Sequence, residues 1–302
     1  MTELSKEDIA DYRKAGKILR TVREEYKKKI KVGDSLLSIA EGIESRIKAL
    51  KAEPAFPCNL SLNNNAAHCT PSINDETVIT KNDLIKVDLG CHVEGCIADT
   101  AFTLDFSGKW SDLKKASENA LNKAVKIIKA GTPLSEIGKT IQNTIEDSGF
   151  KVIENLSGHT IKKLIVHASP SIPNMNTSDP RVLEENTIIA IEPFASTGSG
   201  HVREGNTVEI YALDEPKPVR RKEAREILAK ASGYLTLPFA ERWIAKDYKE
   251  FTRKVALREL IQSKCFQTYP ILRDIEDSIV SQAETTLMLT NKKVFNLLEL
   301  EE

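Results

Sequence analysis

Residues 84–90 read Leu-Ile-Lys-Val-Asp-Leu-Gly, and after a short gap residues 96–101 read Cys-Ile-Ala-Asp-Thr-Ala. Both runs have the composition of buried strands, yet each contains one aspartate, Asp88 or Asp99, and aspartate is disfavoured in strands. Two strands joined by so short a gap predict a β-hairpin. The sequence therefore predicts a hairpin that carries two carboxylates into the core of the fold.

The hairpin's register determines what these carboxylates can do. If the hairpin is centred between Val93 and Glu94, Asp88 lies directly opposite Asp99, with Cβ atoms about 5 Å apart on the same face. Two ionised carboxylates at that distance repel, and burial makes the repulsion worse. A pair of metal ions about 3.5–4 Å apart would neutralise them. The alternative is an exposed hairpin with solvated acids, or one protonated aspartate.

A second feature of the chain is an internal repeat. Three pairs of segments match in order, at offsets of 98, 99 and 104 residues: 33–47 with 131–145, 68–73 with 167–172, and 82–88 with 186–192. The second pair reads His-Cys-Thr-Pro-Ser-Ile and His-Ala-Ser-Pro-Ser-Ile. Apolar helix spacing alone could match by coincidence, but three ordered matches predict two α/β halves of about 100 residues related by a pseudo-twofold axis. Interfaces between such halves favour binding sites.

Periodicity along the rest of the chain predicts an α+β fold. Helical spacing predicts four helices. The first begins after Ser5 and ends by Gly33, and the others lie at about 35–50, 111–129 and 132–149. In the fourth, Thr132 would be the N-cap and Pro133 the first helical residue. Strand patterns occur at about 164–167, 187–192, 207–213, 279–289 and 293–298. The stretch from about 215 to 269 is helical in pattern and rich in charge.

The overall composition excludes several classes of protein. The 302 residues include 43 Lys and Arg against 44 Asp and Glu, and 40% are hydrophobic. A net charge of −1 argues against DNA binding through a global basic field, and the apolar content argues against disorder. Apolar runs stay below the length of about 18 that spans a membrane, and the charged start does not resemble a secretory signal. Five scattered cysteines indicate a reduced, cytoplasmic protein, and Cys91 and Cys96, which the assumed register places opposite each other, are expected to be core residues rather than a disulfide.

Three more residues are candidate metal ligands. His159 follows a glycine in a predicted turn, Glu192 ends a buried apolar strand, and Glu284 precedes another apolar run. Taken singly, His159 could be a capping or core histidine and Glu284 an exposed strand residue. With the two aspartates they form a set of four carboxylates and one imidazole. Four carboxylates balance two divalent ions, and mixed oxygen and nitrogen ligands suit Mn, Fe, Co or Zn. His92 and His201 are expected to lie at the surface or behind the site.

This ordered set resembles the ligands of the pita-bread metallopeptidases, and the chain is similar to the type II methionine aminopeptidases in their short archaeal form. The resemblance covers nearly the whole chain and is carried by six segments: 59–68, 86–90, 97–101, 158–159, 191–195 and 237–240. It implies one catalytic domain over 1–302, built of duplicated α/β halves around a curved antiparallel sheet, with a helical type II insertion at about 215–269. Thr285 departs from the family, which usually has histidine there, and Asn65 replaces a frequent cysteine.

The resemblance also implies the site and the reaction. Asp88, Asp99, His159, Glu192 and Glu284 would bind two divalent ions, and water activated by these ions would attack the first peptide bond. Glu192 would carry the proton, and His68 and His167 would flank the scissile bond and donate hydrogen bonds to it. Phe56, Val166 and Tyr269 would line the methionine pocket, although ordinary core packing is an alternative. The implied function is removal of the initiator methionine from nascent proteins, with small second residues preferred.

Two other functions are considered. A proline-specific aminopeptidase or dipeptidase would share the ligands, but such enzymes usually carry an additional N-terminal domain, for which the 87 residues before Asp88 leave no space. An inactive relative that binds RNA or ribosomes would have lost ligands, and all five are present. The basic runs at 27–29 and 220–222 could contact the ribosome or could be solvated. A monomer is expected.

Overall fold

The computed structural model describes residues 4–291 and 293–299, so the ends of the expected domain, 1–3 and 300–302, lie outside it. The helices are α1 (Lys6–Lys29), α2 (Leu36–Ala49), α3 (Ser111–Ile127), α4 (Leu134–Asp147), α5 (Lys222–Ala231), η1 (Ser232–Tyr234), α6 (Glu241–Ala245) and α7 (Glu250–Gln262). The strands of the first half are β1 (Glu53–Pro54), β2 (Asn59–Leu62), β3 (Asn65–Ala67), β4 (Leu84–Val93) and β5 (Cys96–Asp105). Those that follow are β6 (Lys151–Val152), β7 (Ser157–Lys162), β8 (Ile165–Pro173), β9 (Thr187–Ile191), β10 (Phe194–Ser196), β11 (Arg203–Leu213), β12 (Phe239–Ala240), β13 (Phe266–Arg273), β14 (Val280–Gln282), β15 (Thr285–Leu289) and β16 (Val294–Asn296).

The first two helices, α1 and α2, begin with a serine N-cap whose side chain accepts a backbone hydrogen bond. The Ser5 side chain accepts a hydrogen bond from the Asp8 amide at 3.0 Å, as the N-cap prediction requires. The prediction for α4 is wrong, because Pro133 itself occupies the N-cap position and the helix begins at Leu134. Thr132 instead closes the preceding turn, where its hydroxyl accepts from the Lys129 amide at 3.1 Å.

The central hairpin forms, but its register differs from the predicted one. Asp88 pairs with Ala101, and Asp99 pairs with Gly90, so the two aspartates are diagonal neighbours rather than direct partners. The reason is the turn, a two-residue loop of Glu94 and Gly95 with φ of 49° and 85°. Two central residues at positive φ form the type I′ turn that matches strand twist. Cys91 therefore lies opposite Ala98, and all five cysteines are free.

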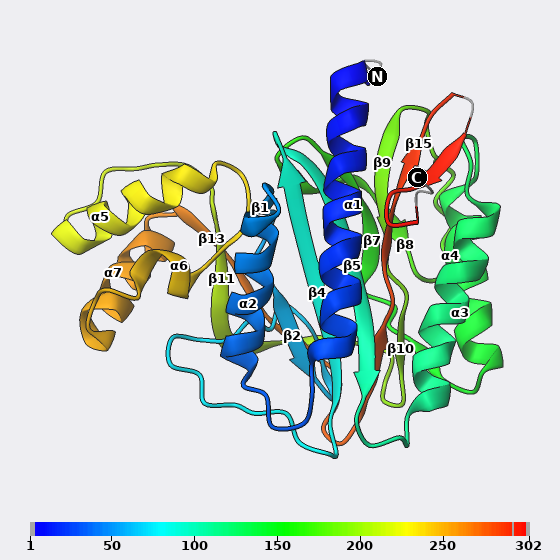
Figure 1. Cartoon of the computed structure of the whole chain (residues 1–302), viewed down its shortest axis with the longest axis horizontal. Coiled ribbons are helices and arrows are strands. Elements are labelled where there is room, and N and C mark those ends of the chain that lie inside the picture. Colours follow the sequence, from blue (N-terminus) through cyan, green and yellow to red (C-terminus); the bar gives the residue numbers. More distant parts are fainter. Residues whose placement is uncertain (1–3, 292, 300–302) are drawn as a thin grey trace.

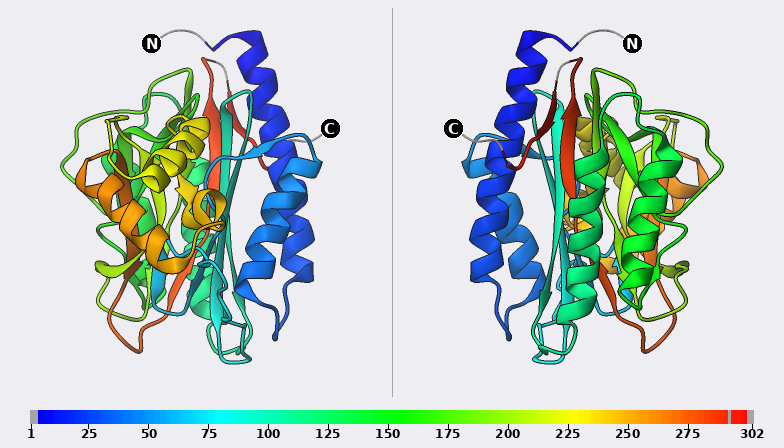
Figure 2. Two further views of the ribbon diagram at one scale, coloured as in Figure 1. Left: turned by 90° about the vertical axis from the view of Figure 1, so that its left-hand side faces the viewer. Right: turned by 90° about the vertical axis from the view of Figure 1, so that its right-hand side faces the viewer.

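Alternation along β4 directs its side chains to two different layers. Val87 and Leu89 belong to the apolar cluster formed with α1 and α2, which cover one side of the hairpin. Because neighbouring strand residues point to opposite faces, Asp88 points away from these helices. Figure 2 shows α1 and α2 side by side along one side of the sheet. The helix-covered face is thus the core, and the opposite face is free to carry polar groups.

The predicted duplication is visible in the backbone. In the first half the Gly33 amide donates to Ile79 at 2.8 Å, and in the second half the Gly131 amide donates to Leu183 at 2.8 Å. The neighbouring bridges, Ser35 with Val78 and Pro133 with Val182, are equivalent as well. α3 and α4 pack beside the second half's strands as α1 and α2 do beside the first (Figure 1). The two halves therefore share one scaffold.

The strand β15, close to the C-terminus, joins the halves. It pairs with β9 of the second half, with Thr285 opposite Ile191. On its other side the Thr286 hydroxyl accepts from the Asp99 amide at 2.8 Å, and the Glu284 amide donates to Ala101 at 3.1 Å. The antiparallel strands of both halves thus meet at the segment that carries Glu284.

The insertion projects beyond the paired halves, at the left of Figure 1. Its helices α5–α7 cover one end of β11 and β13 and share an apolar cluster with Tyr211 and Phe266. The helical prediction over 215–269 is wrong at its end, because β13 begins at Phe266 and Tyr269 pairs with Ile210. Among the described residues, no helix is both long enough and apolar enough to cross a bilayer.

Candidate metal centre and substrate cavity

A cavity of about 450 Å³ lies between the two halves and the insertion. Its volume is within the range typical of small-ligand sites. All ten residues predicted to bind metal or substrate line this cavity: Phe56, His68, Asp88, Asp99, His159, Val166, His167, Glu192, Tyr269 and Glu284. The strands of both halves therefore bring these separate segments to one place.

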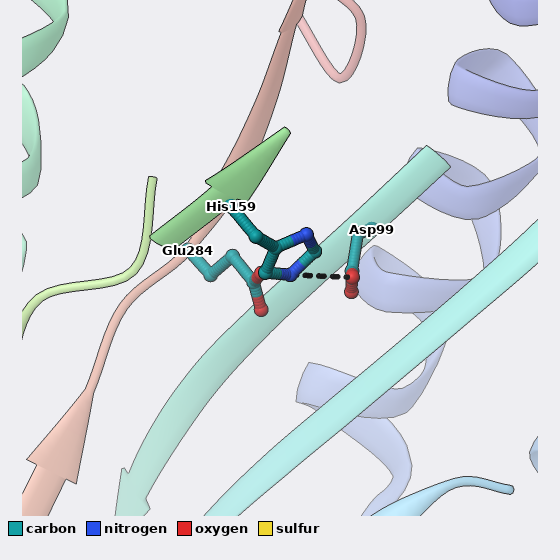
Figure 3. Close-up of side chains that lie close together, drawn as sticks. All are labelled: Asp99, His159 and Glu284. Carbon is teal, nitrogen blue, oxygen red and sulfur yellow. Dashed lines mark ion pairs between the residues drawn. The ribbon is translucent and has the colours of Figure 1, made fainter. Parts of the chain in front are cut away.

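Three of the candidate ligands form a tight group. Asp99, His159 and Glu284 each offer a ligand atom, and these atoms lie within 4.8 Å of one another. Figure 3 shows the three side chains converging, Asp99 from β5, His159 from β7 and Glu284 from the link between β14 and β15. His159 Nε2 lies 3.7 Å from Asp99 Oδ2 and 3.7 Å from Glu192 Oε1. Asp88 lines the same cavity but lies outside the tight group.

The electrostatics of the cluster are unfavourable without a cation. Burial raises the pKa of Asp88 to about 7. Burial and then the Asp88 charge hold the pKa of Asp99 well above its usual range. Burial, with the charges of neighbouring carboxyl groups, does the same to the pKa values of Glu192 and Glu284. Burial lowers the pKa of His159 to about 3, so its imidazole is neutral at physiological pH and retains a lone pair.

These residues fit a divalent metal site. A distance of 3.7 Å is too long for a hydrogen bond. Ligand atoms at about 2.0–2.2 Å from one shared cation lie about 3–4 Å apart, as observed here. Among the described residues, Asp88 Oδ1, Asp99 Oδ1 and Glu284 Oε2 are buried without a hydrogen-bond partner. Buried carboxylate oxygens require a partner, which a cation supplies.

His68 sits at the end of β3 with an unusual backbone conformation. Its φ is 59°, in the left-handed region that non-glycine residues seldom occupy. Its Nδ1 lies 3.3 Å from the Pro270 carbonyl, and Tyr269 packs edge-on at 5.5 Å between ring centroids. Burial lowers the pKa of His68 to about 4, so the ring is neutral. A neutral ring that donates from Nδ1 to Pro270 has Nε2 as an acceptor, whereas the sequence analysis expected a donor.

His167 occupies the equivalent position of the second half but has different surroundings. It lies on β8, is exposed at the cavity, and packs edge-on against His159 with 4.6 Å between ring centroids. The Tyr269 ring is tilted relative to the His167 ring, with 6.3 Å between their centroids. Tyr269 is therefore close to both repeat-related histidines.

The predicted apolar residues form one wall of the cavity. Phe56 and Val166 are buried in the same apolar cluster, and both reach the cavity. A Cβ at Gly90 would lie 2.3 Å from the Phe56 ring, so any larger residue at this strand position would clash with the ring. Glycine at 90 therefore has a steric role in shaping the wall.

Sequence reasoning missed several polar residues of the site. Gln282 Nε2 donates to Glu192 Oε2 at 3.3 Å, and the buried Asn174 donates to the Glu192 carbonyl at 3.0 Å. Gln282 lies two residues before Glu284, and this strand periodicity is the signal that could have revealed it. Asn59 pairs with Asp88 and lines the cavity. The Thr285 hydroxyl donates to Asn296 at 2.7 Å, outside the residues that line the cavity.

The remaining histidines lie outside the cavity, as expected. His201 is exposed and its Nδ1 lies 2.8 Å from Glu154. His92 is half-buried and accepts a hydrogen bond from the Gly95 amide at 3.2 Å at the hairpin turn.

Known proteins of similar sequence include metallopeptidases. The model of metallopeptidase family M24 matches residues 10–212. A methionine aminopeptidase of Methanocaldococcus jannaschii is 45% identical over 95% of this chain and 98% of the relative. A methionine aminopeptidase of Pyrococcus horikoshii is also 45% identical, with the same shares covered.

A solved structure supports the fold as well. The methionine aminopeptidase of Thermotoga maritima superimposes with a TM-score of 0.72 at 22% identity, covering 99% of this chain and 100% of that chain. The expected pita-bread fold is thus confirmed, with its curved antiparallel sheet between duplicated halves. The chain belongs to metallopeptidase family M24, and within it to the type II methionine aminopeptidases.

Proposed function

We propose that this protein removes the initiator methionine from nascent proteins and peptides, with a preference for small second residues. The observation that carries the proposal is the single cavity lined by five candidate metal ligands, two histidines and an apolar wall. The archaeal relatives, 45% identical over almost their full length, are methionine aminopeptidases. The reaction is hydrolysis of the first peptide bond.

Two divalent ions, of Co, Mn, Fe or Zn, would be held by Asp88, Asp99, His159, Glu192 and Glu284. Four carboxylates balance two divalent charges, and the neutral His159 imidazole provides the nitrogen ligand. Such ions acidify water and polarise the scissile carbonyl. Glu192 is oriented by Gln282 and Asn174, which suits a group that passes a proton to the leaving amine.

The two histidines would bind the peptide bond from different sides. With Nδ1 directed to Pro270, His68 would accept a hydrogen bond at Nε2, for example from the amide of the second residue. His167 is exposed at the cavity and can donate to the carbonyl oxygen as negative charge develops there. The tautomer thus gives the repeat-related pair complementary roles.

Phe56, Val166 and Tyr269 would surround the methionine side chain. A flexible thioether packs well against aromatic and aliphatic groups. The wall is mostly buried, so a side chain that enters it loses contact with water. An unbranched side chain of four heavy atoms is therefore favoured over a charged one.

Proline specificity is not favoured, because the relatives of high identity are methionine aminopeptidases. Ribosome contact, a monomeric state and cytoplasmic location stay predictions. The basic runs are partly neutralised, since Lys27 pairs with Glu24 and Lys222 with Glu226. These pairs favour solvated surfaces over nucleic-acid contacts.

The test is hydrolysis of Met-Ala-Ser beside Ala-Pro-Ser, with metal content measured by elemental analysis. We expect cleavage of Met-Ala-Ser only, its loss after treatment with a chelator, and recovery with Mn, Fe or Co. Cleavage of Ala-Pro-Ser in preference would support the proline-specific alternative. Full activity in protein shown to be metal-free would contradict the proposed chemistry.

A further inference from the structure

A buried ion pair connects the insertion to the first half. Arg242 on α6 and Glu44 on α2 are 4% and 7% exposed, and the Arg242 guanidinium donates from Nη2 to Glu44 Oε1. Trp243 Nε1 donates to the other carboxylate oxygen at 2.8 Å. Neither Glu44 nor Arg242 lines the substrate cavity. This pair therefore has no direct part in binding substrate.

The same guanidinium also holds the loop that carries His68. Arg242 Nη1 donates to the Thr70 hydroxyl at 2.7 Å and to the Pro71 carbonyl at 3.1 Å. Thr70 is 4% exposed, and its hydroxyl donates to the Cys58 carbonyl at 2.7 Å. The Cys58 amide donates in turn to Glu44 at 3.2 Å. A closed ring of hydrogen bonds thus links the insertion, the loop and α2.

This ring contacts the chain close to two residues that line the cavity, Phe56 and His68. Thr70 follows His68 by two residues, and Cys58 follows Phe56 by two. The Leu60 amide also donates to the Cys69 carbonyl at 2.6 Å, which ties the two arms of the loop together. His68 has φ of 59°, and a non-glycine residue keeps that conformation only where its surroundings fix it. The hydrogen-bonded ring holds Thr70, only two residues after His68.

We propose that Arg242 is a positioning residue, which acts through Thr70 to hold His68 in its left-handed conformation beside the substrate. The inference rests on the proposed function and extends it: Arg242 then contributes to catalysis from the insertion, although it does not itself line the substrate cavity. A buried ion pair is a poor source of stability compared with apolar residues of the same size. Positioning gives this pair a role that packing does not.

The insertion itself offers a matched control. Arg253 on α7 pairs with Glu241 on α6, with side chains 12% and 11% exposed. This pair is similar in chemistry, burial and location, but among the described residues its hydrogen bonds do not include the His68 loop. Arg253→Lys therefore perturbs the insertion without disturbing the ring.

Thr70→Val tests the proposal most directly, because valine keeps the volume, leaves the ion pair intact and removes the hydroxyl. We expect kcat/KM for Met-Ala-Ser to fall about tenfold, with bound metal unchanged. The Arg242→Lys variant loses the planar guanidinium and its paired donors, so its kcat/KM should fall at least as far. Arg253→Lys should stay within about twofold of wild type. Equal kcat/KM in Thr70→Val and wild type would overturn the proposal.

A double-mutant cycle with His68→Ala identifies the route. If Thr70 acts through His68, Thr70→Val changes the activity of the His68→Ala protein by less than about twofold. The full tenfold loss in that background would mean that Thr70 acts elsewhere, and the proposal would fail.

Imidazole NMR supplies a readout that does not need activity. Thr70→Val should shift the His68 ring signals and leave those of the distant His201 unchanged, and unmoved His68 signals would overturn the proposal. If wild-type protein did not cleave Met-Ala-Ser, the proposed function would fall, and the NMR comparison would still decide whether Arg242 and Thr70 position His68.

Discussion

The two halves of the duplicated unit hold their equivalent histidine segments, 68–73 and 167–172, in different ways. In the second half the Thr160 hydroxyl on β7 donates to the Pro170 carbonyl at 2.8 Å, so the β8 segment after His167 is held by its own hairpin. In the first half the equivalent Pro71 carbonyl accepts from Arg242 at 3.1 Å. The second segment is thus held from within its own half, and the first by a residue of the insertion.

The scaffold beneath these segments has stayed symmetric. Gly33 and Gly131 make the same backbone hydrogen bond at 2.8 Å in both halves, at equivalent helix entries. The site is asymmetric: Asp88 corresponds to Glu192, and the half-buried His68 corresponds to the exposed His167. A duplicated fold can therefore keep its backbone and still give equivalent side chains different chemical roles.

The largest effect tests whether both halves are indispensable. Asp99→Asn removes a proposed ligand of the first half, and His159→Ala removes a proposed ligand of the second. Each should lose metal and lower Met-Ala-Ser hydrolysis by about 10³-fold or more, because several kcal/mol of transition-state stabilisation depend on the ions. Elemental analysis and steady-state kinetics measure both. Turnover close to wild type in either variant would remove that residue from the ligand set.

The next effect compares the repeat-related histidines. His68→Ala and His167→Ala should each lower kcat by about 10²–10³-fold, as loss of a hydrogen bond to the reacting group does. Metal content should remain at the wild-type level in both. If either variant lost metal, that histidine would be a ligand and the proposed asymmetry between the halves would be wrong.

A smaller effect concerns the border between the second half and the insertion. Burial and the Glu241 charge raise the pKa of Glu209 to about 7, against the opposing charges of Arg253 and Arg242, with Asp75 also nearby. A carboxyl group with a raised folded-state pKa favours the folded state below its unfolded pKa of about 4.5, and that stability is lost as the pH rises through about 7.

The free energy of unfolding of Glu209→Gln, relative to that of wild type, should therefore be higher at pH 8 than at pH 5. The gain should be about 1–2 kcal/mol, once solvent screening of this partly exposed group is allowed for. Urea denaturation at the two pH values measures it. A stability difference that does not change with pH would show that Glu209 ionises normally.

The smallest effect tests the shared scaffold. Gly33 and Gly131 have φ of 93° and 86°, and a Cβ at either would have no neighbouring atom within 4 Å. Gly33→Ala and Gly131→Ala should each lower the free energy of unfolding by about 1 kcal/mol through backbone strain alone, and the two losses should be equal. Unequal costs in chemical denaturation would mean that the two helix entries differ in a way that the hydrogen bonds do not show.

The sequence predicted the fold where chemistry is local. An aspartate inside an apolar strand is unusual enough to mark Asp88 and Asp99, and a repeated His-x-[Thr/Ser]-Pro-Ser-Ile string marks the duplication. The structure brings all five candidate ligands to one cavity, while their roles as ligands stay a prediction. Capping by Ser5 and the burial of Val87 and Leu89 also follow from local rules.

Other features depend on information that a single sequence does not display. The hairpin register depends on Glu94 having φ of 49°, and glutamate gives no signal for that conformation. The helical pattern at 263–269 misled because β13 is stabilised by β11, more than 50 residues earlier in the chain. Arg242 resembled any charged residue of an exposed helix, because its partner Glu44 lies 198 positions away.

The placement of β15 has a consequence for how the protein is made. Thr286 bonds to Asp99 across 187 positions, and the same segment pairs with β9. During synthesis each half can begin to collapse around its own helices, but the metal centre cannot close until β15 has emerged. Contacts of such long sequence separation form slowly. The growing chain is therefore expected to remain catalytically silent through most of its own translation, and to acquire metal only as the last strands dock.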